Sequence, residues 1–171
     1  MTPALTESTS MLDEYVRIAR DLETVPLPFP LNTDPIPAWF KDFRGSLCEF
    51  IDTRVRAAWR RGVSVRDACS LEGFGSRADC VQTVPSVLYV LMSHADSFES
   101  AIISAVNDTK DNDTIASIVG AIVGALHGRT AIRKRWVTGI RSRSLSVDGG
   151  LFAEDRNLIE QLATEAAERF G

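Results

Sequence analysis

The sequence contains few residues of the kinds that form zinc sites and disulfide frameworks. Among its 171 residues are two histidines and three cysteines, and no two cysteines have Cys-x-x-Cys spacing. This pattern offers neither the ligand spacing of a zinc site nor the even cysteine number of a disulfide scaffold. Cys48, Cys69 and Cys80 are therefore expected to be reduced thiols in a cytoplasmic protein.

Long hydrophobic runs are missing as well. The longest apolar stretch, residues 115–126, includes Ser117 and is shorter than the roughly 20 residues that a membrane-spanning helix needs. The N-terminal residues include acids and form no apolar core, unlike those of a signal peptide. These absences predict a soluble protein with no membrane partner.

An excess of positive charge is also lacking, because the formal net charge at pH 7 is −4. This balance gives no reason to expect nucleic acid as a partner. One basic cluster lies late in the chain, and it is either a solvated face or a surface for an anionic ligand or partner. Its members are Arg129, Arg133, Lys134, Arg135, Arg141 and Arg143.

The residues that are present have the composition of a globular domain, with 44% hydrophobic and 25% charged residues. No segment alternates apolar and polar residues with the period of two that marks a β-strand. Apolar residues recur instead with the helical period, so we predict an all-α fold in a single domain of residues 1–171. The predicted helical segments are 11–22, 38–61, 64–69, 84–94, 98–106, 115–126, 131–140 and 153–170.

Glycine and proline mark the breaks between these segments. Five of the seven prolines lie in residues 25–37, so residues 1–37 are expected to form an N-terminal helix followed by an extended connector. Gly45 is expected to bend or interrupt the helix over 38–61, and Gly62 is expected to end it.

Two of the predicted helices look buried. The segments 84–94 and 115–126 are apolar on most of their surface, and such helices usually lie inside a protein. The first is expected to begin with Thr83 as its N-cap and Pro85 in its first turn. In the second, Ala116, Gly120 and Gly124 share one face, where a neighbouring helix can approach closely.

The acids that precede the second of these helices form a candidate site. Asp111 and Asp113 flank a single residue, and Thr114 follows them. One explanation is helix capping, because Asp, Asn and Thr are preferred at helix N-termini. The other is a hard-cation site, because carboxylate and hydroxyl oxygens suit Mg²⁺ or Mn²⁺. These donors are too few for a complete octahedral site, so a metal would need ligands from elsewhere.

Several motifs surround these acids in a fixed order. Across residues 80–140 they are Thr83-Val84-Pro85, Phe98–Asn107 (FESAIISAVN), Asp111–Thr114 (DNDT), Gly120 with Gly124, and Arg135-Trp136. In this order the segment resembles the C-terminal half of the ADP-ribosylglycohydrolase family, whose members are similar to dinitrogenase reductase-activating glycohydrolase. The resemblance makes residues 70–171 a family-like core.

The resemblance implies a compact, orthogonal multi-helix bundle with a binuclear Mg²⁺ or Mn²⁺ site. It implies hydrolysis of the glycosidic bond that links ADP-ribose to a modified side chain, with ADP-ribose or an ADP-ribosylated protein as the partner. Asp111, Asp113 and Thr114 would be the metal ligands from this half. The loop with Gly73, Phe74 and Gly75 would line the ligand cleft. Asp108 lies beside the acids and is a weak candidate for the acid or base, because no family motif supports it.

The sequence departs from the family pattern in two places. Thr109 and Lys110 stand where glycines usually precede the metal motif, and Lys110 would oppose a cation if its ammonium pointed inward. The early Thr/Ser-Asp-Asp metal motif is missing, since Thr33-Asp34-Pro35 has proline in place of the second acid. We therefore expect a bundle truncated on its N-terminal side. The alternative function is a non-catalytic family member, either a module that binds ADP-ribose or a protein, or a structural module. A second segment or self-association could cover the exposed apolar surface.

Overall fold

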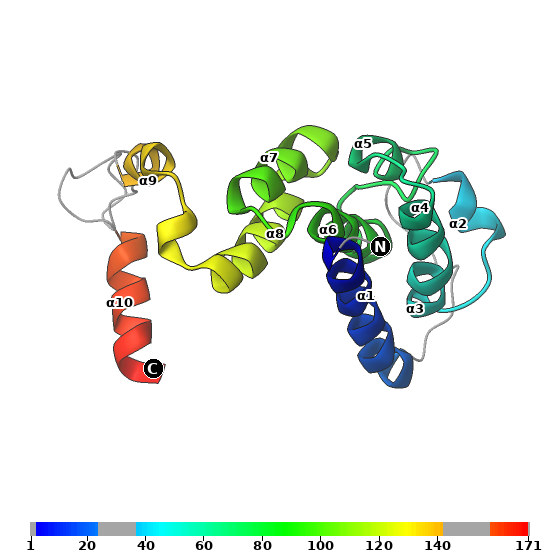
Figure 1. The fold of residues 1–171 in the computed structure, drawn as a ribbon, viewed down its shortest axis with the longest axis horizontal. Coiled ribbons are helices and arrows are strands. Elements are labelled where there is room, and N and C mark those ends of the chain that lie inside the picture. The colour runs from blue at the N-terminus through cyan, green and yellow to red at the C-terminus, as the bar shows by residue number, and fades with distance from the viewer. Residues whose placement is uncertain (1–2, 24–36, 142–157, 171) are drawn as a thin grey trace. The chain divides into compact units, whose positions relative to one another are not determined.

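The computed structural model describes residues 3–23, 37–141 and 158–170, and these residues form an all-α fold, as predicted (Figure 1). The chain divides into two compact units, Met1–Ala131 and Ile132–Gly171. The first unit contains α1 (Pro3–Leu22), α2 (Ala38–Asp42), α3 (Leu47–Phe50), η1 (Ile51–Val55), α4 (Arg56–Arg60), α5 (Val65–Ala68), α6 (Cys80–His94), α7 (Phe98–Asp108), α8 (Asn112–His127) and η2 (Arg129–Ala131). The second contains α9 (Lys134–Arg141) and α10 (Leu158–Phe170).

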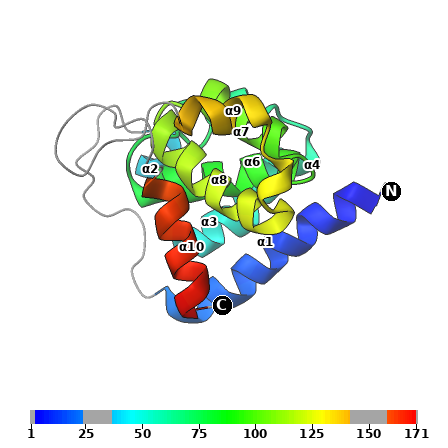
Figure 2. The same cartoon turned by 90° about the vertical axis from the view of Figure 1, so that its left-hand side faces the viewer.

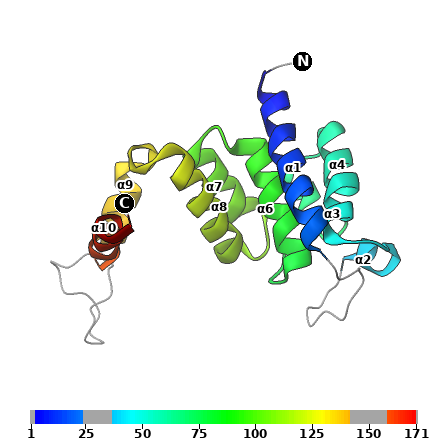
Figure 3. The same cartoon turned by 90° about the horizontal axis from the view of Figure 1, so that it is seen from below.

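Helix α6 is the centre of the first unit. Helices α7 and α8 pack on one side of it, and α1 and η1 pack on the other (Figure 3). In the end-on view, α8 lies in front of α6 (Figure 2). Most side chains from Val81 to Met92 are buried, which confirms the predicted burial of this helix. Tyr89 is completely buried, and its hydroxyl donates a hydrogen bond to the carbonyl of Val63 at 2.7 Å.

The start of α6 differs from the prediction. The structure places Asp79, not Thr83, at the N-cap, and its carboxylate accepts the backbone N–H of Gln82 at 3.0 Å. Thr83 lies inside the helix, where its hydroxyl donates to the carbonyl of Arg77 at 3.1 Å. Asp is preferred over Thr at the N-cap, and this earlier cap moves Pro85 from the first turn into the helix interior.

The segment predicted as one helix over 38–61 is divided into α2, α3, η1 and α4. The interruption contains Gly45 at φ +145°, a conformation that residues with a Cβ rarely adopt. Ser46 then starts α3 through a capping box with Glu49. Gly62, at φ +68°, follows the end of α4, so the prediction of a stop at this glycine is confirmed.

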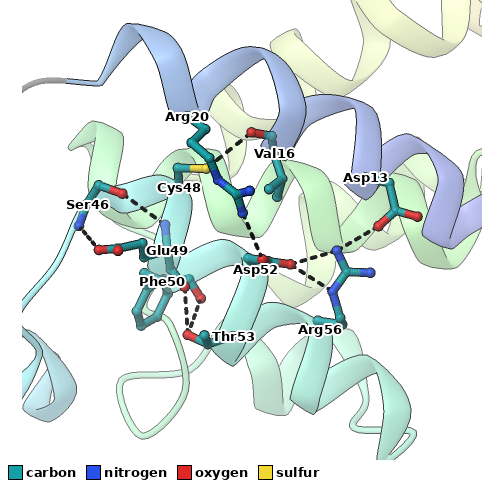
Figure 4. Close-up of polar contacts among 10 residues, drawn as sticks. All are labelled: Asp13, Val16, Arg20, Ser46, Cys48, Glu49, Phe50, Asp52, Thr53 and Arg56. Atoms are coloured by element: carbon teal, nitrogen blue, oxygen red, sulfur yellow. Dashed lines mark hydrogen bonds and ion pairs between the residues drawn. The ribbon is translucent and has the colours of Figure 1, made fainter.

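A charged network joins α1 to the η1–α4 segment (Figure 4). Arg56 lies between Asp13 of α1 and Asp52 of η1, with nitrogen–oxygen distances of 2.8 Å to both. Arg20 of α1 makes a longer contact of 3.5 Å with Asp52. Leu12 and Val16 of α1 are buried in the core, as the helical period predicts. These two N-terminal segments therefore form the layer that covers α6.

Helix α8 is only half buried, and the predicted burial of residues 115–126 is wrong for its outer face. Ile115, Val119 and Val123 are completely buried, whereas Ile122 is 44% and Leu126 65% exposed. Apolar composition does not reveal whether a neighbour covers both faces of a helix. Among the described residues, the elements that make extensive contacts with α8 are α6, α7 and η2.

The small residues of α8 do allow a close helix contact, as predicted. A Cβ added to Gly120 would lie 3.2 Å from Cδ1 of Ile102 in α7, and one added to Gly124 would lie 3.7 Å from Cε2 of Phe98. The distance of 3.2 Å at Gly120 is shorter than most contacts that a Cβ atom makes, so a side chain there would displace Ile102. Gly120 therefore permits the observed approach of α7 to α8.

In the second unit, α9 and α10 agree in position with the helices predicted over 131–140 and 153–170. The side chains from Leu162 to Arg169 of α10 are all exposed. Residues 153–157, Arg143 and the connector residues 25–36 lie outside the described residues. Within the described part of the chain, no helix combines the length and apolar character needed to cross a membrane.

Candidate functional site

The glycine-bearing loop before α6 is held tightly against the core. The backbone N–H of Gly75, at φ +76°, donates to the carbonyl of Ser70 at 2.8 Å, and the hydroxyl of Ser86 in α6 donates to the carbonyl of Gly75 at 2.8 Å. The side chain of Phe74 is 5% exposed, and its carbonyl accepts the indole N–H of Trp39 at 3.0 Å. These contacts give the loop one fixed path across the end of α6.

The predicted ligand-binding residues of this loop face the core in part. Phe74 contacts the aromatic rings of Phe50 and Tyr89, and Gly75 is buried beside Gln82. The adjacent pocket is lined by later loop residues, Ser76 and Arg77. The role of Gly73, Phe74 and Gly75 in ligand binding stays a prediction, and their observed contacts are those of packing.

Ser76 connects this loop to the acid cluster. Its side chain is buried, with 2% exposure, and its hydroxyl donates to the carbonyl of Cys69 at 2.8 Å. The same oxygen accepts the backbone N–H of Lys110 at 2.9 Å, and the carbonyl of Ser76 accepts the N–H of Asp111 at 2.8 Å. The connection between α7 and α8 is therefore fixed to the loop, and the glycine loop and the acids are brought together. The sequence gives no spacing signal for this serine.

Asp111 is at the N-cap position of α8, but its side chain makes no capping hydrogen bond. Its Oδ2 atom is buried and has no hydrogen-bond partner among the described residues. The carboxylate of Asp113 accepts the backbone N–H of Thr114 at 2.9 Å. Helix capping thus accounts for the backbone position of Asp111. It does not account for the Oδ2 atom, because a buried acceptor without a hydrogen-bond partner lowers the stability of the fold.

The two carboxyl groups of the cluster influence one another. Burial raises the pKa of Asp111, and a hydrogen bond to the neighbouring carboxyl of Asp113 raises that pKa further. The same hydrogen bond lowers the pKa of Asp113, and the backbone N–H of Thr114 lowers it as well. Two adjacent negative charges repel each other, which is consistent with the opposite directions of the two pKa shifts. A cation between them would remove that repulsion.

Asp108 is engaged by two partners. One carboxylate oxygen lies 2.9 Å from the guanidinium of Arg66, and the other accepts the hydroxyl of Ser104 at 3.0 Å. The side chain of Arg66 is 72% exposed, so it can move away from this contact. The acid or base role of Asp108 stays a prediction. In this structure the side chain of Asp108 forms an ion pair with Arg66.

Asp111, Asp113 and Thr114 supply two carboxylates and a hydroxyl, which are the donors that Mg²⁺ and Mn²⁺ prefer. The unpartnered Oδ2 of Asp111 is where such an ion gains a ligand. Mg²⁺ is commonly held by one or two carboxylates together with water, so these residues fit one ion. The described residues contain no group of three or more acidic, histidine or cysteine side chains placed to hold a metal, so they do not complete a binuclear site.

A pocket of about 470 Å³ opens beside the acid cluster. Ser76 lines it, and the chain from Asn107 to Lys110 forms another part of its wall. Three cationic side chains, Arg66, Arg77 and Lys110, line it together with one carboxylate, that of Asp108. A volume of this size is within the range of small-molecule sites.

The comparison with known families identifies the family of this chain. Residues 8–171 match the family model described as ADP-ribosylglycohydrolase, so the chain belongs to the ADP-ribosylglycohydrolase family. The match begins well before residue 70, where the motif resemblance starts, so it includes α1 and the α2–α4 segment.

An uncharacterized protein of Archaeoglobus fulgidus is similar to this chain, with 35% identity over 107 residues. The similar region covers 62% of this chain and 30% of the relative, so the chain spans less than a third of the length of that protein. No solved structure matches the chain.

Proposed function

We propose that this protein acts in the hydrolysis of the glycosidic bond between ADP-ribose and a modified side chain, with Mg²⁺ or Mn²⁺ bound at Asp111, Asp113 and Thr114. Family membership supports the reaction class. The observation that carries the site is the buried, unpartnered Oδ2 of Asp111 beside the carboxyl of Asp113. Two neighbouring carboxylates repel each other, and a divalent cation between them would stabilise the pair.

The residues of the chain prepare the site in definite ways. The hydrogen bonds from Lys110 and Asp111 to Ser76 fix the backbone of the acids, so little ordering is needed when a ligand arrives. Both oxygens of Asp111 can act as metal ligands only when its carboxyl group is ionised. When bound, a divalent ion supplies a more acidic water and stabilises negative charge that develops as the bond breaks.

A general acid or base would also be needed for this reaction. Asp108 is the candidate that the sequence offers, and its side chain contacts Arg66 and Ser104. Release of Arg66 toward an anionic ligand would free one oxygen of Asp108. This role rests on the position of Asp108 in the pocket wall, between Asn107 and Thr109.

The second candidate function is a non-catalytic family member that binds ADP-ribose or a protein. It is favoured by the lack of a third acidic, histidine or cysteine ligand near Asp111 and Asp113 in the described residues. Family membership agrees with both functions. Self-association through the exposed face of α8 and a cytoplasmic location belong to this proposal as further predictions.

The test is titration of the purified chain with Mn²⁺ and Mg²⁺, followed by assays on ADP-ribosylated arginine and serine peptides. We expect cation binding that the double variant Asp111→Asn/Asp113→Asn abolishes and that Asp42→Asn, an exposed acid on α2, leaves intact. Cation binding without peptide hydrolysis would favour the non-catalytic function. An unchanged cation affinity in the double variant would refute the metal site.

A further inference from the structure

The strongest charge asymmetry of the chain lies in residues 129–143. These residues contain six Lys or Arg residues and no acid, and no Asp or Glu occurs anywhere between Asp113 and Asp148. The rest of the chain has 13 basic and 23 acidic side chains, which is a net charge of −10. A basic cluster of this density creates a local positive potential although the chain as a whole is negative. Neither the metal site nor the proposed reaction uses this charge.

Helix α9 presents part of the basic cluster to solvent. Arg133, Lys134 and Arg135 are exposed, and the carbonyl of Arg133 accepts the backbone N–H of Trp136 at 2.9 Å, so the three cations lie at the start of the helix. The N-terminal end of a helix carries a positive partial charge, which favours acids and disfavours cations there. The first turn of α9 contains no acid. Because these cations reduce the stability of the helix, binding explains their presence better than folding does.

Apolar side chains lie beside these cations. Trp136 and Val137 of α9 are half-buried, so part of each side chain is accessible at the surface. The guanidinium carbon of Arg135 lies 6.0 Å from the centroid of the Trp136 ring, which places charge and aromatic surface side by side. Basic residues next to a tryptophan on an amphipathic helix are typical of segments that lie at a lipid interface. Tryptophan favours that layer because its ring has an apolar body and a polar N–H.

A nucleic acid would also be attracted by the cations, but the rest of the segment suits it less. Residues 114–156 contain no Asn or Gln, the amide side chains that pair with adenine edges. The apolar surface of Val137 gains nothing from a phosphate backbone, whereas it gains free energy when it leaves water for the boundary of the lipid chains. The combination of charge with apolar surface therefore favours a membrane.

We propose that α9 and its flanking basic residues bind the surface of a membrane that contains anionic phospholipid. Lys134 and Arg135 contact the negatively charged head groups, and the ring of Trp136 enters the interfacial layer. Clusters of four to eight basic residues on an amphipathic helix are typical of this kind of attachment. It requires no membrane-spanning helix, in agreement with the lack of such a helix among the described residues. The attachment is independent of the proposed metal site.

The experiment is co-sedimentation of the full chain with vesicles of phosphatidylcholine alone and of phosphatidylcholine with about 30% phosphatidylserine. We expect binding to the anionic vesicles only, and binding that weakens as the salt concentration rises from about 0.1 M to about 1 M. The double variant Lys134→Gln/Arg135→Gln should bind about 30-fold more weakly. The matched control, Arg60→Gln/Arg61→Gln, removes the same charge from two exposed arginines at the end of α4 and should bind as the wild type does.

A second measurement tests the role of Trp136. Lipids brominated in their acyl chains should quench part of the tryptophan fluorescence of the wild type, and this quenching should disappear in Trp136→Phe. Trp39 and Trp59 provide the background signal, because both pack against the core of the first unit. Circular dichroism checks that each variant is folded, and the comparison of the two vesicle types needs no variant at all.

Four results would overturn the proposal. The first is equal binding, or no binding, of the wild type to the two vesicle types. The second is a loss of binding in Arg60→Gln/Arg61→Gln as large as that in Lys134→Gln/Arg135→Gln. The third is an absence of quenching in the wild type, since the ring of Trp136 would then lie outside the lipid layer. The fourth is tighter binding to a short RNA or DNA duplex than to anionic vesicles at the same salt concentration, which would identify a nucleic acid as the partner.

Discussion

The carbonyl oxygen of Ser76 accepts the backbone N–H of Asp111 at 2.8 Å, and this bond joins a loop and a helix start that are far apart in the sequence. The hydroxyl of the same serine bonds to Cys69 and Lys110. A single buried residue therefore sets the position of the acid cluster relative to the loop and the pocket. The first prediction concerns its removal.

Replacing Ser76 with alanine should lower the free energy of unfolding by about 1–3 kcal/mol, because two backbone groups lose their partner at a buried position. Urea denaturation measures this change. Ser117→Ala, at an exposed position of α8, is the control and should have little effect. The variant should also weaken cation binding, since the backbone at Lys110 is released. A Ser76→Ala protein as stable as the wild type would show that this connection is not needed for the fold.

The stability of Asp111 variants can separate capping from metal binding. The side chain of Asp111 makes no capping hydrogen bond, so Asp111→Ala should change the free energy of unfolding by less than about 0.5 kcal/mol in metal-free buffer. Asp79 is the matched comparison, because its carboxylate does cap α6. Asp79→Ala should cost about 1–2 kcal/mol. Equal losses in the two variants would mean that Asp111 serves as a cap after all.

How far the sequence predicts this structure depends on the kind of information involved. The helices over 11–22 and 84–94 follow from the spacing of apolar residues, which is local and strong. The division of 38–61 follows partly from Gly45, but the π-helical turn η1 has no sequence signal that we can identify. By residue type, Asp79 is a better N-cap for α6 than Thr83. The loop contacts that place Asp79 at the start of the helix are set by tertiary structure.

The candidate site shows the same limit. The acids at Asp111 and Asp113 are visible in the sequence because they stand together before an apolar helix. Ser76 is not, because its role depends on contacts with residues more than thirty positions away. Asp108 looks like a free carboxylate in the sequence, and only the structure reveals that Arg66 holds it.

The stability of the protein should also depend on pH in a way that reports on the acid pair. The pKa of Asp111 is raised above its ordinary value of 3.8, so the folded state binds more protons there than the unfolded state does. Its contribution to stability is therefore present at low pH and is lost as pH rises through the raised pKa. Asp113, whose pKa is lowered, contributes in the opposite direction, with stability that is lost as pH falls through its lowered pKa.

The substitution Asp111→Asn removes the stability change that comes from the raised pKa of Asp111. Relative to the wild type, this variant should gain stability as the pH rises above 3.8, and the gain should level off once Asp111 of the wild type is ionised. Urea unfolding at a series of pH values, in metal-free buffer, measures the difference. Cation affinity of the wild type should rise over the same pH range, because the proton on Asp111 competes with the metal. A pH-independent difference between the two proteins would contradict the raised pKa.

The last prediction concerns self-association through the outer face of α8. From Thr114 to Leu126 this helix carries no charged side chain, and Ile118, Ile122 and Leu126 form an exposed apolar row along it. A solvated helix face normally carries charges, so such a row is typical of a surface that another copy or segment covers. Ile122→Glu should shift the protein toward monomer, with at least a tenfold weaker self-association, as measured by sedimentation velocity.

The control for this prediction is Ile18→Glu on α1, which changes an isoleucine of similar exposure, 47% against 44%, on a different helix. The α1 variant should associate like the wild type, because Arg17 and Arg20 lie beside Ile18 in the sequence and give this part of α1 charged side chains. A monomeric wild type at concentrations above about 100 μM would exclude a dimer of useful affinity, since a specific interface normally reaches micromolar strength or better. The apolar row of α8 would then be covered by another protein or not at all.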